Sequence, residues 1–430
     1  MIQYDVVVVG GGAAGMMAAI FAKRAGRSVL LCEKMPKLGK KVLVSGAGRC
    51  NILSDKVGAE FYNTEARALA ASVFGQFGKD KILGFFKELG LEVYTQDDGR
   101  MFPVTDQASS VLKVLEMELE RLKVSVGLNC EVKNLHIIQG GFELKLSQAT
   151  PSPFRHTSLD GSVLWRISSL PSQRGRGPGE GGRGDVRCRE VILAGGGRSY
   201  PALGSDGNAY ALAQKFGHTI VEPVPSTVAL LVKDPWCHSL QGQKIRAAVT
   251  SRIQNKNIRT VSGELLFTQY GLSGTAILDV SEEISIAMNR ERIREIQVEA
   301  DLLPSFSEEA LKTELSRRLA RGISAEHLLE GLLPAKFSAA MKSLLGKKDL
   351  AAIILDLKHR RFKVDGTRGW NEAEFTAGGV ATGEVHVKTL ESKIQKGLYL
   401  AGEMLDVNGH RGGHNLAWAW ASGAVAGSQK

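Results

Sequence analysis

Three glycines near the N-terminus have the spacing of a turn that binds the phosphates of a dinucleotide. Gly10, Gly12 and Gly15 follow the apolar run Val6–Val9 and precede small residues that favour a helix. In such a turn the first glycine permits a tight bend, the second lets the backbone approach a pyrophosphate, and the third lets helix and strand pack closely. Because a helix N-terminus attracts anions, the pattern predicts dinucleotide binding. A glycine turn in some other parallel α/β protein is the alternative.

An acidic residue further along supports the dinucleotide interpretation. Glu33 lies eighteen residues after Gly15, at the end of the next predicted strand. Its carboxylate can accept hydrogen bonds from ribose hydroxyls, and it would repel a 2′-phosphate. Strand, helix, second strand and acid together are more specific than the glycines alone.

A second glycine-rich turn, near the C-terminus, indicates FAD rather than NAD. The apolar strand Gly397–Ala401 ends in Gly402 and Glu403, and a glycine loop then enters a helix expected to start near Asn415. This order brings Glu403 beside the ribityl or pyrophosphate region. It also points the positive end of the helix at the flavin N1–O2 edge, where reduction places negative charge. A plain strand, turn and helix without a cofactor is the alternative.

Two histidines in this C-terminal loop, His410 and His414, are the candidate catalytic residues. A side chain that titrates near neutrality suits a proton transfer coupled to hydride transfer. A helix cap or a surface position is the simpler interpretation, and it is preferred for each histidine.

The elements that must position these residues begin with a βαβ unit. We expect a strand near residues 4–9, a helix over 13–25 and a second strand over 28–33. The continuous apolar run of the first strand is typical of a parallel strand that is covered on both faces.

Another buried strand, 190–194, runs into the glycines Gly195–Gly197. Because Pro201 opposes a helix directly after this turn, it is interpreted as a return strand that covers the FAD rather than as a second dinucleotide unit. NAD(P)H, if it reduces this protein, would then dock transiently over the flavin.

The remaining pattern predicts an α/β protein in which a Rossmann-type FAD-binding domain, with three layers and a parallel sheet, carries an inserted β-rich domain and a small helical domain. Helices are expected near 80–89 and 109–122, strands near 124–135 and 141–146, mainly short strands over 225–299 and mainly helices over 308–357. The expected parts are the FAD-binding domain in three pieces (1–147, 188–224 and 375–430), a flexible Arg/Gly/Pro-rich loop (148–187), the β-rich domain (225–300) and its helical part (301–374).

The composition is that of a globular protein with 430 residues, 43% apolar residues and a net charge of +10. Five scattered cysteines without a CxxC pair favour neither a disulfide framework nor a zinc site, so a reducing compartment and a cytoplasmic location are expected, with no bound metal. The seventeen uncharged positions from Val6 to Ala22 are not interpreted as a membrane or signal segment, because glycines interrupt them and the basic residues follow rather than precede them.

Six motifs in a fixed order extend the argument over nearly the whole chain: Val44–Asn51, Gly197–Ser205, Gly263–Gly274, Thr376–Val380, Glu391–Lys393 and Leu398–Asp406. Together they resemble the bacterial NAD(P)/FAD-dependent oxidoreductases of the BaiN and aminoacetone-oxidase-like group. The resemblance implies a glutathione-reductase-type FAD domain, with flavin held between it and the inserted domain. It also implies that the loop from Ser45 to Asn51 runs beside the cofactor.

The predicted contacts of a non-covalent FAD follow from these motifs. They are Gly10, Gly12, Ala13, Ala14, Gly15, Glu33, Lys34, Ser45, Gly46, Gly48, Arg49, Cys50, Asn51, Val132, Ala194, Gly195, Gly196, Gly402, Glu403, Asp406, Gly413, Asn415 and Leu416. For Arg49, a surface salt bridge is the alternative. For Cys50, a packed structural thiol is preferred over a redox thiol, because no second cysteine is near in sequence.

The sequence also departs from that group. Thr275 stands where relatives have proline, His414 stands where they have tyrosine, and the loop after Gly204 is shortened to Ser205–Gly207. These changes leave the FAD prediction intact, but they remove the basis for transferring a substrate preference.

The leading hypothesis is an FAD oxidoreductase that moves hydride through flavin N5, between NAD(P)H or an organic substrate and a second acceptor. The resemblance suggests keto, enoyl or amine compounds as small-molecule substrates. An RNA-binding flavoprotein is the alternative, motivated by the net charge and the Arg/Gly loop. It is disfavoured, because that loop has few aromatic residues for base stacking. A flavin-binding protein without turnover is the third hypothesis, and no oligomeric state is predicted.

Overall fold

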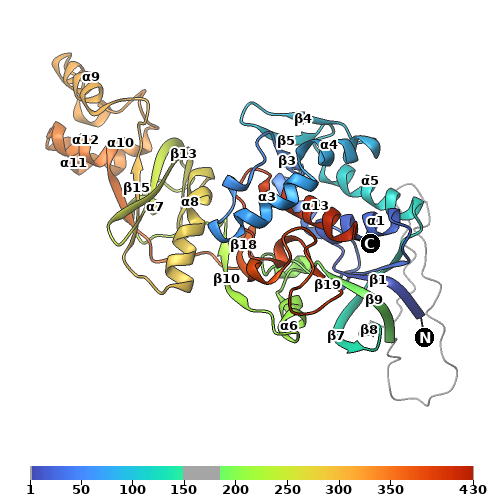
Figure 1. Ribbon diagram of the computed structural model, residues 1–430. Helices are drawn as coiled ribbons and strands as arrows, with labels where there is room; N and C mark the ends of the chain where they lie inside the picture. The colour runs from blue at the N-terminus through green and yellow to red at the C-terminus, as the bar shows by residue number, and fades with distance from the viewer. Residues whose placement is uncertain (1, 149–184, 430) are drawn as a thin grey trace. The chain divides into compact units, whose positions relative to one another are not determined.

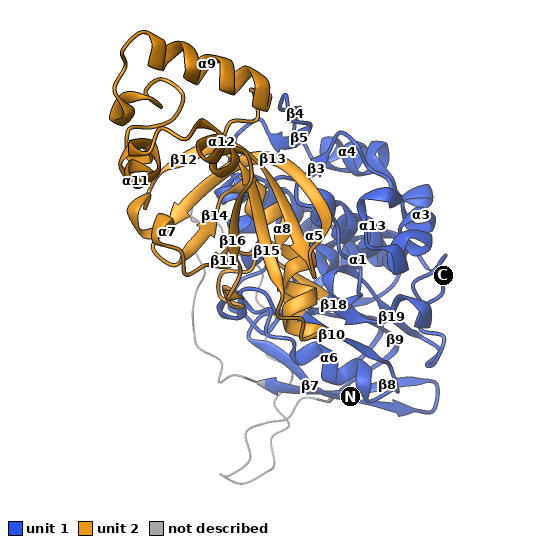
Figure 2. Ribbon diagram, turned by 90° about the vertical axis from the view of Figure 1, so that its left-hand side faces the viewer, with its two compact units in different colours: residues 1–223, 378–430 blue, residues 224–377 orange. Residues whose placement is uncertain are grey.

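The structure, a computed structural model, describes residues 2–148 and 185–429 (Figure 1). These residues form two compact units, which Figure 2 colours separately. Unit 1 contains Met1–Pro223 and Gly378–Lys430, and unit 2 contains Val224–Ala377. The chain therefore leaves unit 1 once and returns to it once.

The predicted Arg/Gly/Pro-rich loop, residues 148–187, lies mostly outside the described residues. Its expected ends were wrong, because Gln148 is the last residue of strand β8 (Gly141–Gln148) and Asp185 is the first residue of strand β9 (Asp185–Leu193). The two strands pair in antiparallel register, with Phe142 opposite Cys188. Regular structure therefore extends further into this segment than its composition suggested.

A seven-stranded sheet forms the centre of unit 1. Its strand order is β6-β2-β1-β9-β8-β7, and β19 pairs with β9 off this path. Five strands pair in parallel: β1 (Ile2–Val9), β2 (Val29–Cys32), β6 (Ser125–Gly127), β9 and β19 (Leu398–Leu400). The hairpin of β7 (Cys130–Ile138) and β8 completes the sheet at one edge. Because β19 lies near the end of the chain, distant parts of the sequence share this sheet.

The predicted βαβ unit is confirmed. Helix α1 (Ala13–Arg24) connects β1 to β2, and Val6 on β1 pairs with Val29 on β2 in parallel register. Val6, Val7 and Val8 are all fully buried, so both faces of β1 are covered, as a continuous apolar run requires.

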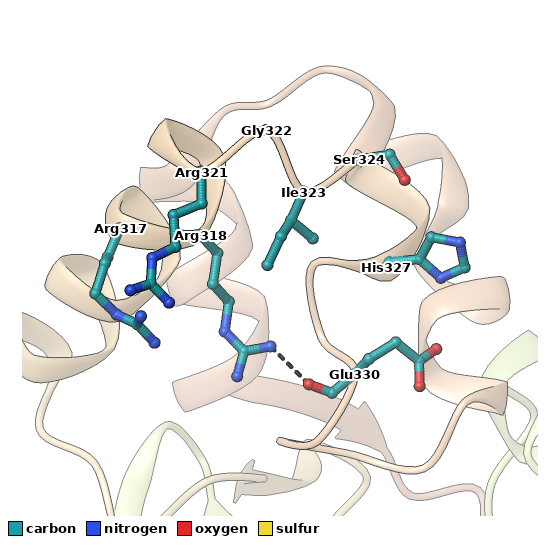
Figure 3. A pocket seen from close by; sticks show the side chains of 8 residues that line it. All are labelled: Arg317, Arg318, Arg321, Gly322, Ile323, Ser324, His327 and Glu330. Carbon is teal, nitrogen blue, oxygen red and sulfur yellow. Dashed lines mark hydrogen bonds between the residues drawn. The ribbon is translucent and has the colours of Figure 1, made fainter.

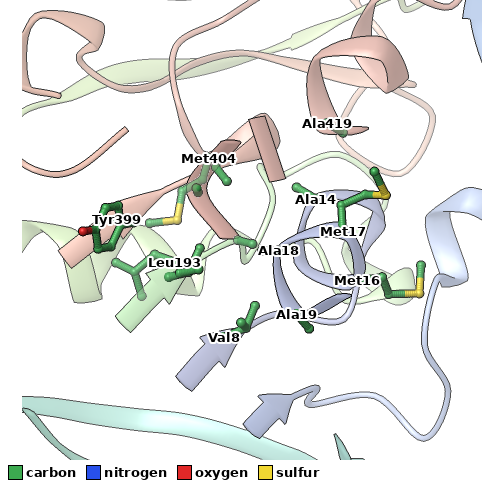
Figure 4. Close-up of a cluster of buried hydrophobic side chains, with 14 of the residues drawn as sticks. Val8, Ala14, Met16, Met17, Ala18, Ala19, Leu193, Tyr399, Met404 and Ala419 are labelled. Carbon is green, nitrogen blue, oxygen red and sulfur yellow. The ribbon is translucent and has the colours of Figure 1, made fainter. Parts of the chain in front are cut away.

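Helix α13 (His414–Gly427) packs against α1 through small residues. A Cβ atom added at Gly423 would lie 2.3 Å from the carbonyl oxygen of Ala14, and one added at Gly427 would lie 2.4 Å from that of Ala18. The two helix backbones can approach this closely only because both positions are glycine. Figure 4 shows the core around α1, to which β1, β9, β19 and α13 contribute side chains.

The rest of unit 1 is arranged around this centre. Its further helices are α2 (Lys40–Val44), α3 (Arg67–Gln76), α4 (Lys79–Glu88), α5 (Ala108–Arg121) and α6 (Asn208–Gln214). A small sheet has the order β3 (Leu53–Ser54), β5 (Arg100–Pro103) and β4 (Val93–Thr95). Strands β10 (Ile220–Ser226) and β18 (Phe375–Val380) pair as a two-stranded sheet and contain the two crossings between the units.

Unit 2 is built on a seven-stranded sheet with the order β16-β15-β12-β13-β14-β11-β17, in which all pairs are antiparallel. The strands are β11 (Leu230–Leu231), β12 (Lys244–Ile253), β13 (Lys256–Thr268), β14 (Gly271–Ser273), β15 (Ile296–Asp301), β16 (Arg360–Lys363) and β17 (Gly366–Thr367). The helices are α7 (Pro235–Ser239), α8 (Thr275–Ser285), α9 (Glu308–Ala320), α10 (Lys336–Ala340), α11 (Lys342–Gly346) and α12 (Leu350–Lys358).

Two features of unit 2 differ from the predicted pattern. The stretch expected to hold mainly short strands contains helix α8, whose buried Ala276, Val280 and Ile284 have helical spacing. The helical part expected over residues 301–374 also supplies β16 and β17 to the sheet, after the helices expected over 308–357. These strands were missed because they are only four and two residues long, and Phe362 is the one buried apolar residue of β16.

The apolar run from Val6 to Ala22 is divided between β1 and α1. No helix in the described ranges has both the length and the apolar character that a membrane span requires. In the same ranges, no three His, Cys, Asp or Glu side chains are grouped so that they could hold a metal ion.

Candidate functional site

The N-terminal glycine turn has a different geometry at each glycine. Gly10 has a φ of +104°, and a Cβ atom there would lie 2.4 Å from the carbonyl oxygen of Ala194. A Cβ atom at Gly15 would lie 1.8 Å from the carbonyl oxygen of Gly10. At Gly12, the residue before α1, a Cβ atom would meet no heavy atom within 4 Å. Gly10 and Gly15 are therefore required by the protein's own packing, whereas Gly12 leaves open space at the helix N-terminus.

Three segments that are distant in sequence meet at this turn. Ala194 contacts Gly10, and a Cβ atom at Gly402, which has a φ of +73°, would lie 2.7 Å from the Cβ atom of Ala14. Gly195 and Gly196 follow Ala194. A Cβ atom at Gly195 would lie 2.3 Å from the Cβ atom of Ala209, and one at Gly196 would lie 2.9 Å from the hydroxyl of Ser205. The predicted residues of these segments are thus brought together in unit 1. Ala13 is the first residue of α1 and is half-buried.

Glu33 lies directly beside the glycine turn. One oxygen of its carboxylate accepts a hydrogen bond from the Gly11 amide at 2.7 Å, and the other accepts one from the Met35 amide at 2.7 Å. Burial raises the pKa of Glu33, although these two amides oppose the shift. The two bonds fix the carboxylate while leaving each oxygen a further lone pair, so Glu33 can still accept from a hydroxyl.

A pocket opens at the carboxyl ends of β1 and β2. It is lined by Val9, Gly10, Cys32, Glu33, Lys34, Cys130, Glu131, Val132, Gly195, Gly204, Asn208, Ala209 and Leu212. Ligands of open α/β sheets bind at this end of the strands. Five of the lining residues, Gly10, Glu33, Lys34, Val132 and Gly195, were predicted cofactor contacts.

Other lining residues were missed. Asn208 and Glu131 are two of them, and the Asn208 side-chain amide donates to Glu131 at 2.7 Å. The predicted contact Lys34 forms an ion pair with Asp206 at 2.6 Å. These pairs join the segment after Gly204 to β7 and to the residues just after β2. The short segment Ser205–Gly207, which leads directly into α6, was the available signal.

The loop from Ser45 to Asn51 has an unusual backbone. Gly46, Ala47, Gly48 and Cys50 all have positive φ values, between 55° and 84°. Two of these residues are not glycine, and such strain is commonly found at functional sites. Asn51 accepts a hydrogen bond from the Met101 amide at 3.3 Å, which connects the loop to β5.

Cys50 is a packed thiol in this loop. Its side chain is fully buried, and burial raises its pKa to about 12. A thiol with this pKa is almost wholly protonated near neutral pH and is a poor nucleophile. The preferred interpretation of Cys50 as a structural thiol therefore agrees with its surroundings.

Arg49 and Ser45 have partners within the protein. The Arg49 guanidinium stacks on the ring of Phe102 at 4.2 Å from the centroid and lies 3.9 Å from the Asp106 carboxylate. The Ser45 hydroxyl donates to the carbonyl of Val42 at 2.7 Å. Arg49 therefore has the ion pair that was the alternative interpretation, and its partial exposure leaves it able to contact a ligand as well.

A hydrogen-bonded group surrounds Glu403. The ammonium of Lys41 lies 2.6 Å from one oxygen of the Glu403 carboxylate and 2.7 Å from the hydroxyl of Ser199, and that hydroxyl donates to the other oxygen at 2.9 Å. Ser199 is fully buried. Sequence reasoning identified Glu403 but missed Lys41 and Ser199, since nothing in the local pattern shows that these segments meet.

The C-terminal loop leads into α13 one residue earlier than predicted. Gly413 precedes the helix with a φ of +106°, and His414 is its first residue. The side chain of Asn415 both accepts from the Gly409 amide, at 2.8 Å, and donates to the Gly409 carbonyl, at 2.9 Å. The Asn415 side chain therefore stabilises the loop that precedes α13.

Two other predicted residues flank this helix start. Asp406 is buried and accepts a hydrogen bond from the Asn408 side chain at 3.1 Å. Leu416 is half-buried and packs against the core of unit 1.

The two candidate catalytic histidines have different environments. His410 is exposed, with its ring 6.0 Å from that of Phe61. His414 is only 5% exposed and stacks on Phe61 at 4.4 Å. Burial, together with the nearby His410, lowers the pKa of His414 to about 4. At neutral pH His414 is therefore uncharged.

Acid is expected to destabilise the protein partly through His414. Its pKa is about 4 in the folded protein and about 6.5 when unfolded, so between these pH values the unfolded chain binds more protons. The free energy of unfolding should fall as pH decreases from 6.5 to 4, by roughly 3 kcal/mol from this residue. In His414→Phe, which keeps the stacking on Phe61, this part of the decrease in the free energy of unfolding should be absent. Urea unfolding of both proteins at pH 7, 5.5 and 4.5 measures the difference. If the free energies of unfolding of the two proteins fell equally with pH, His414 would not be a source of the acid destabilisation.

Unit 2 has a separate hollow that contains none of the predicted site residues. It is lined by Arg317, Arg318, Arg321, Gly322, Ile323, Ser324, His327 and Glu330 (Figure 3). Arg318 donates to the carbonyl of Glu330 at 2.6 Å, and Glu314 binds both Arg317 and Arg318 at 2.7 Å. Because the protein's own acceptors hold two of these arginines, we assign no ligand to this hollow.

Buried polar atoms test whether unit 1 fits FAD. Within the described residues of unit 1, four such side-chain atoms lack a hydrogen-bond partner: Ser205 Oγ, Tyr210 OH, Asn408 Oδ1 and His414 Nδ1. Tyr210 lies on α6. Burial has the largest effect on its pKa, which it raises, and the carboxylates of Glu403 and Asp406 in the C-terminal loop raise it further. Buried polar atoms are normally satisfied, and a dinucleotide has polar groups along its whole length. These atoms and the open space at Gly12 fit such a ligand.

Comparison with known proteins gives concordant results. The sequence profile of a family described as HI0933-like protein Rossmann domain matches residues 4–157 and 179–429. The chain is similar to a 3-dehydro-bile acid delta(4,6)-reductase of Clostridium scindens, with 33% identity over 98% of this chain and 97% of the relative. It is also similar to a ribosomal RNA dihydrouridine synthase of Escherichia coli, with 29% identity over 98% of this chain and 96% of the relative.

A solved structure shares the fold at low sequence identity. The 3-ketosteroid delta1-dehydrogenase of Sterolibacterium denitrificans aligns with a TM-score of 0.50 and 13% identity, over 99% of each chain.

Proposed function

Because this chain belongs to the HI0933-like family and is an FAD-dependent oxidoreductase, we propose that it reduces carbon–carbon double bonds conjugated to a carbonyl group. One observation carries the proposal: two full-length relatives with different names act on the same chemical feature. The name of the bile acid reductase denotes double bonds in a ring system that bears a 3-oxo group. The name of the dihydrouridine synthase denotes saturation of the uracil ring of uridine. In both, the double bond is polarised by a carbonyl.

The residues of unit 1 would hold the cofactor as follows. The open backbone at Gly12 and the start of α1 would receive the pyrophosphate, and Glu33 would accept hydrogen bonds from the ribose. Lys41 and Ser199 hold the Glu403 carboxylate in one orientation, so that it can accept from a cofactor hydroxyl. The start of α13 would place positive potential near the flavin. FAD, when bound, supplies hydride-transfer chemistry.

Reduction of a conjugated double bond also requires a proton at the carbon next to the carbonyl. We propose that His410 delivers it, because His410 is exposed and can exchange protons with solvent. His414, buried and neutral, would position Phe61 and the loop instead. NAD(P)H is the proposed reductant.

For the substrate we favour a small cyclic enone, since the bile acid reductase has the higher identity of these two relatives. A uridine within RNA is the second candidate. The name of the Escherichia coli relative and the net charge of +10 support it.

An anaerobic two-step experiment tests the proposal. The protein would first be mixed with NADH or NADPH, and loss of the oxidised-flavin absorbance is expected with at least one of them. The reduced protein would then be mixed with a steroid 4-en-3-one or with ribosomal RNA, and the enone should restore the absorbance. A saturated ketone of the same ring system is the control. If neither the enone nor the RNA restores the absorbance, the proposed reaction is wrong.

A histidine variant tests the proton donor in the same experiment. His410→Gln should slow the second step by roughly 100-fold and leave the reaction with NAD(P)H unchanged. His136→Gln, which replaces an exposed histidine on β7, is the matched control. Equal rates for both variants would remove His410 from the mechanism.

A further inference from the structure

Two cysteines line the pocket in which we place part of the FAD. Cys32 is the last residue of β2 and is 1% exposed, whereas Cys130 is the first residue of β7 and is half-buried. Both residues line the pocket, together with Glu33 and Glu131. They are 98 residues apart in sequence, so only the fold brings them together.

Backbone pairing places the two thiols next to each other. Cys32 pairs in register with Gly127 on β6, and the amide of Cys130 donates to the carbonyl of Glu33 at 2.8 Å. A Cβ atom added at Gly127 would lie 3.3 Å from the sulfur of Cys130. The sulfur of Cys130 therefore occupies the space above the glycine that pairs with Cys32, on the strand beside β2.

The two thiols are chemically unequal. The neighbouring Cys32 thiol lowers the pKa of Cys130, while Cys130 and burial raise the pKa of Cys32. Cys188, on the neighbouring strand β9, is buried with its pKa raised to about 12. Cys130 is therefore the thiol that ionises first and that reagents can reach from the pocket.

We propose that Cys32 and Cys130 are a peroxide-sensitive pair that forms a disulfide inside the nucleotide pocket. The Cys130 thiolate attacks hydrogen peroxide, breaks the O–O bond and, with one proton, yields a sulfenic acid and water. The Cys32 thiol then attacks this sulfur and releases a second water. Overall, two thiols lose two electrons and two protons, and one peroxide becomes two waters.

Bound FAD should control access to this pair. Cys130 is reached through the pocket, so FAD that occupies the pocket would shield it from peroxide. The disulfide would in turn tie the end of β2, one residue before Glu33, to the start of β7. This dependence on FAD rests on the proposed location of the cofactor, whereas the disulfide itself does not.

Mass spectrometry tests both parts. The purified protein, with FAD and after FAD removal, would be treated with hydrogen peroxide, alkylated with iodoacetamide and digested. We expect a peptide pair that joins Cys32 to Cys130, forming on the order of tenfold more slowly with saturating FAD. Cys32→Ser should leave a sulfenic acid at Cys130 that reacts with dimedone. Cys237→Ser, in unit 2, is the matched control and should behave like the unchanged protein.

Each outcome has a separate meaning. A disulfide that involves Cys188, or none at all, would overturn the proposed pair. A Cys32–Cys130 disulfide that forms equally fast with and without FAD would overturn the shielding and the location of FAD in this pocket. Neither result depends on turnover, so failure of the proposed reaction would remain distinguishable.

Discussion

Replacing Gly12 by valine is expected to weaken FAD binding by about 100-fold or more while the protein stays folded. Gly12 has an extended backbone, with φ of −79° and ψ of −169°, which any residue adopts without strain. A Cβ atom there meets nothing within 4 Å, so the side chain would enter only the space in which we place the pyrophosphate. We expect the dissociation constant for FAD to rise by about 100-fold or more. Flavin fluorescence after ultrafiltration measures the loss, and circular dichroism reports the fold.

Gly15→Val is the matched comparison in the same turn. A Cβ atom at Gly15 would lie 1.8 Å from the carbonyl oxygen of Gly10, so α1 would have to move away from β1. This variant should lose the fold together with FAD and accumulate as insoluble protein. If Gly12→Val were also insoluble, or if it retained FAD, the different roles of the two glycines would be refuted.

A single methyl group added at Gly423 is expected to destabilise unit 1 by about 3 kcal/mol. In Gly423→Ala the new Cβ atom would lie 2.3 Å from the carbonyl oxygen of Ala14 and 2.9 Å from the Cβ atom of Met17. Both contacts are with the backbone or the rigid part of α1, so α13 must shift as a whole, and overpacking of this kind costs about 1–3 kcal/mol or more. Urea unfolding, followed by the tryptophan fluorescence to which Trp418 and Trp420 of α13 contribute, would measure the loss.

Gly84→Ala makes the same chemical change where nothing opposes it. Gly84 lies on the exposed side of α4, and a Cβ atom there meets no atom within 4 Å. Alanine should stabilise this helix by about 0.5–1 kcal/mol. Equal effects of the two substitutions would show that helix propensity, and not the contact between α1 and α13, determines the result at Gly423.

The sequence was sufficient to predict the nucleotide-binding half of the fold. The resemblance to the BaiN group, the βαβ unit and the Rossmann-type FAD-binding domain are confirmed. Local patterns carry this information, because continuous apolar strands and the Gly10–Gly15 spacing each specify a local geometry.

Contacts between distant segments were not predictable. Lys41 and Ser199 have no local pattern that connects them to Glu403, and their hydrogen bonds exist only because α2, the segment after β9 and the C-terminal loop meet. The thiol contact between Cys32 and Cys130 was overlooked for the same reason, since counting cysteines along the chain shows no short spacing. Asn415 illustrates a different difficulty: an amide side chain near a cofactor loop can as readily bind its own loop, here at Gly409.

The packing of α13 on α1 also affects how the protein is made. Residues 1–223 leave the ribosome without α13, so the surface of α1 around Ala14 and Ala18 stays exposed to solvent. Unit 2 is continuous in sequence and can fold while unit 1 is still incomplete. At 5–20 residues per second, synthesis from residue 224 to the end of α13 takes roughly 10–40 s. The contact of α13 with α1, and the approach of Gly402 to Ala14 in the glycine turn, can form only after the C-terminal segment has emerged.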